Sequence, residues 1–247
     1  MDSALLIVLC GAAAAGFAQG VSGFAFSLVA LSIWAWAVEP QMAAAMAVFG
    51  ALFGQIVALP FIWRGFELKK LLPLLAGGLA GVPLGVLLLS WFDPTLFKFG
   101  LGVFLLFYCP LMLFLRPDFV IARGGWLADA VAGIGGGILG GIGGIAGPIP
   151  TLWTTLRGWS KETQRGVLQA FNICMHVTTL TAYGLSGTLN GETLNMFAII
   201  ALPVAVPALL GVQLFNRLDA RAFRRMILIL LMISGLALIW GAVGHWI

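Results

Sequence analysis

The sequence is poor in charged residues. Asp, Glu, Lys and Arg make up only 9% of its 247 residues, whereas 61% are hydrophobic. Soluble domains carry roughly 25% charged residues, so a soluble fold of this length could not bury so much apolar surface. A lipid bilayer is the natural solvent for such a chain. Its net charge of +4 comes from basic residues in short loops between apolar segments, so no nucleic-acid partner is expected.

Cysteine is also scarce, and the three thiols lie singly in apolar stretches, at Cys10, Cys109 and Cys174. Without a CxxC pair or a metal-ligand spacing, neither a metal nor a cofactor is expected. The sequence further lacks a Walker motif, an HExxH motif and an intramembrane pair of Asp residues. We therefore expect no enzyme, since Ser22 with His176 alone would be a weak catalytic pair.

Runs without charge predict about eight membrane segments, because a helix crosses the bilayer with about 20 residues. The first half, 1–120, is predicted to contain a hairpin at 4–38 and helices at 41–63, 71–92 and 96–115. The second half, 121–247, is predicted to contain a hairpin at 126–156 and helices at 166–184, 193–216 and 223–245. The runs 4–38 and 126–156 are too long for one straight helix and contain glycine clusters. Each therefore predicts two short helices around a glycine-rich tip.

The basic residues predict the orientation of the chain. They gather in the loops 64–70, 116–123, 157–165 and 217–225. Basic loops stay in the cytoplasm, which leaves both termini outside, in the periplasm of a bacterial inner membrane. Each half then has one hairpin that does not cross and three helices that do, so the halves are inverted. The predicted fold is an all-α polytopic membrane protein of two inverted repeats.

The repeat is visible in the residues themselves. An offset of 117 aligns Gly16, Gly20 and Gly23 with Gly133, Gly137 and Gly140, and Gln55 with Asn172; an offset of 126 aligns Gly85 with Gly211, Asp93 with Asp219, and Lys98 with Arg224. Many secondary transporters are inverted repeats whose sites lie near the midplane, where broken helices end. The two hairpins are therefore the predicted location of a substrate site.

Both hairpins carry recognisable motifs. The segment 16–26, GFAQGVSGFAF, resembles the opening signature of the TauE/SafE sulfite-exporter family, and 137–150, GILGGIGGIAGPIP, is similar to its second-half signature. The likeness extends over nearly the whole chain. The second signature departs from the first in having more glycine and no Ser or Gln at its tip. The resemblance implies a membrane permease for sulfite, sulfonates or other small organic anions.

The glycine tips are the first candidate site. Glycine allows tight turns that expose backbone N–H groups, and a helix beginning there points its positive end at the midplane. That arrangement could bind an anion without Lys or Arg. The candidate residues are Gln19, Gly20, Ser22 and Gly23 in the first tip, and Gly140, Gly143, Gly144 and Gly147 in the second. The alternative is that these glycines only allow close helix packing.

A polar stripe is the second candidate. Gln169, Asn172, His176, Thr179 and Tyr183 follow one another at steps of three and four, which places them on one face of a helix. Such a face should point to the protein interior or to water. It could line a pathway or make hydrogen bonds between helices, and Gln55 joins it as the repeat partner of Asn172. His176 could be structural, bind the anion or carry a proton.

These features predict a transporter for a small organic or inorganic anion, with sulfite or an organosulfonate as the expected substrate. Alternating access around a midplane site is the expected mechanism. The inside-negative potential favours anion exit by about 2.3 kcal/mol per charge per 100 mV, so an exporter needs no fuel domain. The alternative is a non-transporting membrane subunit or sensor that binds a small anion. The expected partners are the anion and the lipid bilayer, and a homodimer is allowed.

Overall fold

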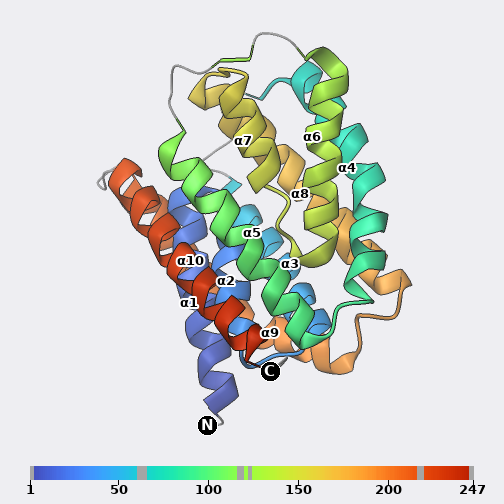
Figure 1. The fold of residues 1–247 in the computed structure, drawn as a ribbon, viewed down its shortest axis with the longest axis vertical. Helices are drawn as coiled ribbons and strands as arrows, with labels where there is room; N and C mark the ends of the chain where they lie inside the picture. Colours follow the sequence, from blue (N-terminus) through green and yellow to red (C-terminus); the bar gives the residue numbers. More distant parts are fainter. Residues whose placement is uncertain (1–2, 60–65, 116–119, 122–123, 216–219, 245–247) are drawn as a thin grey trace.

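The computed structural model describes residues 3–59, 66–115, 120–121, 124–215 and 220–244, and this part of the chain is helical throughout, without a strand. Its first five helices are α1 Ser3–Ser22, α2 Phe26–Trp34, α3 Pro40–Ala58, α4 Leu68–Leu89 and α5 Pro94–Phe114. The next five are α6 Gly125–Gly143, α7 Pro148–Leu156, α8 Lys161–Leu185, α9 Gly191–Phe215 and α10 Ala220–Val243. In Figure 1 they form one bundle, elongated along the vertical axis.

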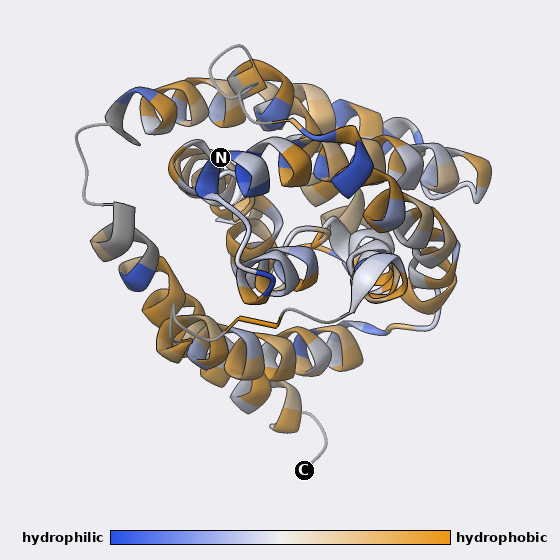
Figure 2. Cartoon of the chain, turned by 90° about the horizontal axis from the view of Figure 1, so that it is seen from above, coloured by the Kyte–Doolittle hydropathy of each residue, from blue (hydrophilic) through white to orange (hydrophobic). Residues whose placement is uncertain are grey.

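Seven of the described helices are long and apolar enough to cross a membrane: α1, α3, α4, α5, α6, α9 and α10. Large apolar side chains cover their outer faces, among them Phe107 at 77% exposure and Trp240 at 84%. Figure 2 shows hydrophobic colouring along most of the ribbon, with hydrophilic colouring confined to short stretches. Such a surface suits lipid rather than water. The prediction of an all-α polytopic membrane protein is confirmed.

The predicted hairpins are partly wrong in their lengths. Each was expected to pair two short helices, but α1 has 20 residues and α6 has 19, followed by nine in each of α2 and α7. The chain breaks at Gly23 and Gly144, whose φ angles of +85° and +69° are ones that residues with a Cβ rarely adopt. The earlier glycines lie inside α1 and α6, because glycine permits a bend without forcing one.

The remaining predicted boundaries can be compared with the helices directly. The predicted helix 41–63 ends as α3 at Ala58, and residues 60–63 lie outside the described part of the chain. The predicted helix 166–184 begins earlier, as α8 at Lys161, because Ser160 caps it: its Oγ accepts from the N–H of Thr163 at 3.2 Å. Asp93 likewise caps α5 through the N–H of Leu96 at 2.7 Å.

Glycine lets two helix pairs approach closely. A Cβ added to Gly20 of α1 would collide with the backbone of Ala208 in α9, and one added to Gly141 of α6 would lie 2.5 Å from the carbonyl oxygen of Val82 in α4. Gly211 lies against Gly20, and Gly85 lies against Gly141. The pairs α1–α9 and α4–α6 therefore pack backbone to backbone, as in many membrane helix pairs.

These contacts bear on the register of the predicted repeat. The offset of 126 pairs Gly85 with Gly211, and their partners Gly141 and Gly20 then differ by 121, one helical turn from the predicted 117. The breaks at Gly23 and Gly144 have the same spacing of 121. In Figure 1, α1 begins at the lower end of the bundle and α6 at the upper end. The inverted repeat stays a prediction, and these contacts favour 121 for the hairpins.

Candidate functional site

The two helix breaks lie against each other. A Cβ added to Gly144 would lie 2.9 Å from Ser27 Oγ, and one added to Gly147 would lie 3.0 Å from Phe24 Cβ. Phe24 and Ser27 belong to the first break and the start of α2, whereas Gly144 and Gly147 flank the second break. The structure thus brings together the two segments that the sequence singled out, far apart along the chain.

Ser22 shapes the first break. Its Oγ accepts from the N–H groups of Ala25 at 3.1 Å and Phe24 at 3.4 Å, while the N–H of Gly23 donates to Gln19 O at 2.6 Å. A Cβ added to Gly23 would meet nothing within 4 Å. The first break is therefore held by its own residues and leaves space beside Gly23.

The second break ends one helix and begins another within four residues. The N–H of Gly144 donates to Gly140 O at 2.7 Å, and that of Ile145 to Leu139 O at 3.2 Å, which closes α6 with a left-handed residue. Helix α7 then begins with Pro148, whose fixed φ suits a first helical position. Proline has no N–H, so the start of α7 offers fewer donors than the start of α2.

His176 joins three elements at this junction. Its Nε2 lies 3.0 Å from Gly144 O in the second break, and its Nδ1 lies 3.3 Å from Gln55 Oε1 in α3. Both His176 and Gln55 are almost completely buried. Gln55 thus contacts His176, 121 residues later, whereas the sequence alignment makes Asn172 its repeat equivalent, which stays a prediction.

Asn172 reaches the second break without a full set of hydrogen bonds. Its Nδ2 and Oδ1 would lie 3.3 and 3.5 Å from a Cβ added to Gly147, and its side chain is buried. Among the described residues its Oδ1 has no hydrogen-bond partner. Buried polar atoms are normally paired, so this amide beside a helix break is a strong candidate to contact a ligand.

The rest of the polar stripe is also buried, as the spacing of α8 predicts. The Tyr183 hydroxyl donates to Gly141 O at 2.6 Å and so forms a hydrogen bond between α8 and α6. Gln169 Nε2 and Thr179 Oγ1 find no partner in the described part of the chain. The hydrogen-bonding alternative therefore holds for Tyr183, and pathway lining stays a prediction for the members that remain unpaired in the interior.

Several predicted tip residues have packing contacts rather than exposed amides. Gly20, Gly140 and Gly143 lie inside helices, where Gly20 meets α9, Gly140 would place a Cβ 3.2 Å from Ala146 Cβ, and Gly143 would place one 2.7 Å from Leu31 Cδ1. Gln19 donates from Nε2 to Ala51 O at 2.8 Å, and its Oε1 is buried without a partner among the described residues. Gln19 thus connects α1 to α3 close to the site.

The sequence analysis missed two polar residues beside the breaks, Ser27 and Thr151, and a third, Asp129, near the start of α6. Ser27 meets Gly144, and its position directly after the first glycine tip was the available signal. Thr151 of α7 is buried, and its Oγ1 has no partner in the described residues. Asp129 of α6 is buried at the edge of a charge-free run, where it accepts from Trp153 Nε1 at 2.7 Å and lies 3.6 Å from Arg157 Nε.

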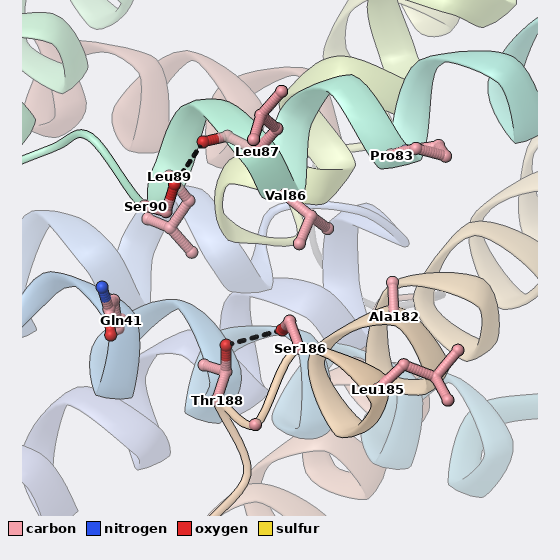
Figure 3. A pocket seen from close by; sticks show the side chains of 11 residues that line it. Gln41, Pro83, Val86, Leu87, Leu89, Ser90, Ala182, Leu185, Ser186 and Thr188 are labelled. Atoms are coloured by element: carbon pink, nitrogen blue, oxygen red, sulfur yellow. Dashed lines mark hydrogen bonds between the residues drawn. The ribbon is translucent and has the colours of Figure 1, made fainter.

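A pocket of about 560 Å³ opens at one end of the α4–α8 pair. Figure 3 shows Leu87 of α4 and Ser90 just after it on one side, Ser186 and Thr188 after α8 on the other, and Gln41 of α3 beside them. None of the predicted site residues lines this pocket. It lies at the C-terminal ends of α4 and α8, beyond the Tyr183 end of the polar stripe.

The opposite ends of the same two helices are joined. Thr163 Oγ1 donates to Glu67 Oε1 at 2.7 Å, and Lys70 Nζ lies 3.0 Å from the same oxygen. The hydrogen bond from Thr163, together with Lys70, lowers the pKa of Glu67 below its ordinary value. Helices α4 and α8 are therefore held together where they begin and are separated by the pocket where they end.

Metal chemistry finds no support in the described residues, in which no three His, Cys, Asp or Glu side chains gather to hold an ion. The polar groups at the breaks are amides, hydroxyls and one imidazole. Such groups can bind and orient a small solute.

Comparison with known proteins identifies the family. The model of the family described as sulfite exporter TauE/SafE matches residues 7–238. Over 258 aligned residues, covering 100% of both chains, the sequence is 27% identical to a protein of Cupriavidus necator named probable sulfite/organosulfonate exporter TauE. No solved structure matches the chain significantly. The family match covers almost the whole chain and confirms the resemblance of the two glycine motifs. The chain belongs to the sulfite exporter TauE/SafE family of membrane transport proteins.

Proposed function

We propose that the protein transports sulfite or a small organosulfonate by alternating access around the junction of its two helix breaks. The observation that carries this proposal is the contact of Ser27 with Gly144 beside the buried Asn172 amide, whose Oδ1 has no partner among the described residues. The name of the Cupriavidus relative supports the substrate class. The family is one of transporters, which favours transport over catalysis.

The junction suits an anion in two respects. The short helices α2 and α7 both begin there, so their first N–H groups and the positive ends of their dipoles point at it. Asn172 adds an amide whose Nδ2 can donate to an oxyanion oxygen, and the Ser27 hydroxyl, which donates to Ala47 O at 3.5 Å, could turn to do the same. Neutral donors of this kind can bind a singly charged oxyanion and still release it, as a transporter must.

The ends of the α4–α8 pair suggest which way the described conformation opens. The beginnings of these helices, next to the basic loops, are closed by the Thr163–Glu67 hydrogen bond, and the pocket opens at their other ends. Basic loops stay in the cytoplasm. We therefore propose a bacterial inner-membrane protein with periplasmic termini, in a conformation whose pocket faces the periplasm. Transport would require the closed end to open while the pocket closes.

Ligand-dependent thermal stabilisation of the purified protein tests the substrate class, because a ligand that binds only the folded state raises its apparent stability. The series is sulfite, thiosulfate, taurine, isethionate, sulfoacetate and simple carboxylates. We expect sulfite or a sulfonate to raise the melting temperature more than carboxylates do. If no sulfur oxyanion shifts it, the proposal is wrong.

Flux through proteoliposomes separates the transporter from a sensor. Vesicles loaded with the stabilising anion should lose it faster when they contain the protein than when they contain lipid alone. Binding without flux would favour the alternative of a non-transporting subunit or sensor.

A further inference from the structure

His176 faces hydrogen-bond acceptors with both ring nitrogens. Its Nε2 lies 3.0 Å from the carbonyl oxygen of Gly144, and its Nδ1 lies 3.3 Å from Oε1 of Gln55. A carbonyl oxygen can only accept, so Nε2 must carry a hydrogen whether the ring is neutral or charged. The state of Nδ1 is therefore the one variable proton of this ring.

The amide of Gln55 can match either state of Nδ1. With Nδ1 protonated, the ring donates to both neighbours, and Gln55 presents its oxygen, as the structure has it. With Nδ1 bare, Gln55 must turn its NH₂ group toward the ring to keep the hydrogen bond. A second proton on the His176 ring can therefore be accommodated, and the orientation of the Gln55 amide depends on whether it is present.

Other charges are distant from this ring. Helices α3, α4, α6 and α7 pack against α8, and of these α3 and α7 contain no titratable side chain. Helix α4 has Lys69 and Lys70 at its start. Helix α6 has Asp129, which accepts a hydrogen bond from Trp153 and forms an ion pair with Arg157. On α8 itself, Lys161, Glu162 and Arg165 lie in the first turns, about three to four turns from the ring. Cys174 lies two residues away, and Tyr183 donates to Gly141. No described carboxylate faces His176 to balance a charge on it.

We propose that His176 takes up one proton with each anion that binds, so that the proton and the anion enter the junction as a neutral pair. This inference rests on the proposed function, since it needs an anion beside Gly144 and Asn172. A buried imidazolium without a counter-charge is costly, and an anion at the break supplies that counter-charge. By linkage, the proton strengthens anion binding as much as the anion strengthens proton binding. The proton passes from water to Nδ1 and no covalent bond changes in the anion.

Uptake of a proton with the anion changes the force that drives transport. A singly charged anion that moves with one proton carries no net charge, so the membrane potential no longer drives it. The pH difference and the anion gradient would then set the direction of transport. This differs from the potential-driven exit expected from the sequence alone.

Calorimetry in buffers of different ionisation enthalpy counts the protons taken up on binding. Isethionate is the first probe, because its sulfonate stays ionised at all usable pH values. The variants are His176→Gln and, as a matched control, His245→Gln, which removes the only other histidine. At a pH where free His176 is neutral, we expect uptake of about one proton per anion in the wild type and in H245Q, and none in H176Q. The wild-type Kd should rise about tenfold per pH unit there, and that of H176Q should not change.

The outcomes distinguish the two proposals. If only sulfite binds, the same titration is done with sulfite, whose own protons cancel in the difference between wild type and H176Q. Binding with equal proton uptake in both would overturn the inference and leave anion transport standing. Absence of binding by every sulfur oxyanion would overturn the proposed function as well. Should H176Q fail to fold, ring ¹⁵N NMR of H245Q reports His176 alone, and a ring that stays neutral when the site is saturated contradicts the inference.

Discussion

At the scale of single residues, Asn172 gives the most direct test of the site. The substitution Asn172→Leu keeps the side-chain volume and removes a buried amide whose Oδ1 has no partner in the described residues. An unpaired buried polar group costs about 1–3 kcal/mol, so we expect the ligand-free protein to be as stable as the wild type or more stable. The melting-temperature shift caused by the anion should be lost.

The matched control for Asn172 is Thr181→Val on the same helix. Thr181 is exposed, and its hydroxyl donates only to the carbonyl of Val177 in its own helix, at 2.9 Å. This variant should keep the full anion-dependent shift. If N172L also keeps it, Asn172 is not a ligand of the anion and its unpaired oxygen needs another explanation.

Gly20 gives a second test, of packing rather than binding. A Cβ at this position would collide with the backbone of Ala208, which cannot move aside as a flexible side chain could. We expect Gly20→Ala to cost about 1–3 kcal/mol, measured as a lower melting temperature without anion. Gly100→Ala is the control, because a Cβ at Gly100 meets nothing within 4 Å and alanine favours a helix by up to about 1 kcal/mol. Equal stability of the two variants would show that α1 and α9 are not closely packed.

Residue patterns alone could predict part of the site and had to miss the rest. Steps of three and four placed the α8 stripe on one face, and its burial followed from the cost of polar groups in lipid. The role of each glycine could not be predicted from the sequence. The absence of a Cβ permits the turn at Gly23 and the close helix packing at Gly20 equally well. The repeat equivalent of Gln55 could not be decided, since an apolar sequence aligns almost as well one helical turn away, where Gln55 corresponds to His176.

At the scale of helices, the Glu67–Thr163 hydrogen bond is expected to control the closed end of the α4–α8 pair. The lowered pKa of Glu67 means that its contribution to this contact is complete above the ordinary pKa of glutamate and is lost as the pH falls through the lower, folded-state value. At pH 7, Glu67→Gln should therefore weaken the contact, whereas the wild type should retain it down to mildly acidic pH.

Hydrogen exchange measures this opening. In E67Q, the amides in the first turns of α8 should exchange several times faster at pH 7, with no change around Tyr183 at the other end of the stripe. Glu192→Gln removes the same charge from the first turn of α9, beyond the opposite end of α8, and should leave the first turns of α8 unchanged. Unaltered exchange in E67Q would mean that other contacts close this end.

Helix α8 shows why the spans could be predicted only in part. Charge-free runs predicted the spans, among them 166–184 for α8, because a segment that crosses lipid must be largely uncharged. Helix α8 has 25 residues but is not among the seven apolar enough to cross by composition. Its polar face is enclosed by α3, α4, α6 and α7, so burial inside the bundle replaces the apolar sequence that lipid would demand.

At the scale of the whole molecule, the two halves make corresponding contacts. Helix α1 packs on α9 as α6 packs on α4, α3 packs on α9 as α8 packs on α4, and α5 packs on α10. If each helix of the first half, α1 to α5, is exchanged with its counterpart in the second half, α6 to α10, the same set of contacting pairs is obtained. The predicted inverted repeat requires that property, and at an offset of 121 it would make Gln55 and His176 equivalent residues, whose Oε1 and Nδ1 lie 3.3 Å apart.

The inversion makes a specific prediction about the two ends of α8. Helix α8 should cross the membrane, with Lys161 in the cytoplasm beside a basic loop and Ser186, next to the pocket, in the periplasm. In a background with Cys10, Cys109 and Cys174 replaced, Ser186→Cys should react with a membrane-impermeant maleimide applied to right-side-out vesicles. Lys161→Cys should react only after the membrane is permeabilised. Both side chains are exposed, so burial cannot explain a failure to react. Labelling of both cysteines from one side would mean that α8 does not cross, and the pairing of inverted halves would then have to be abandoned.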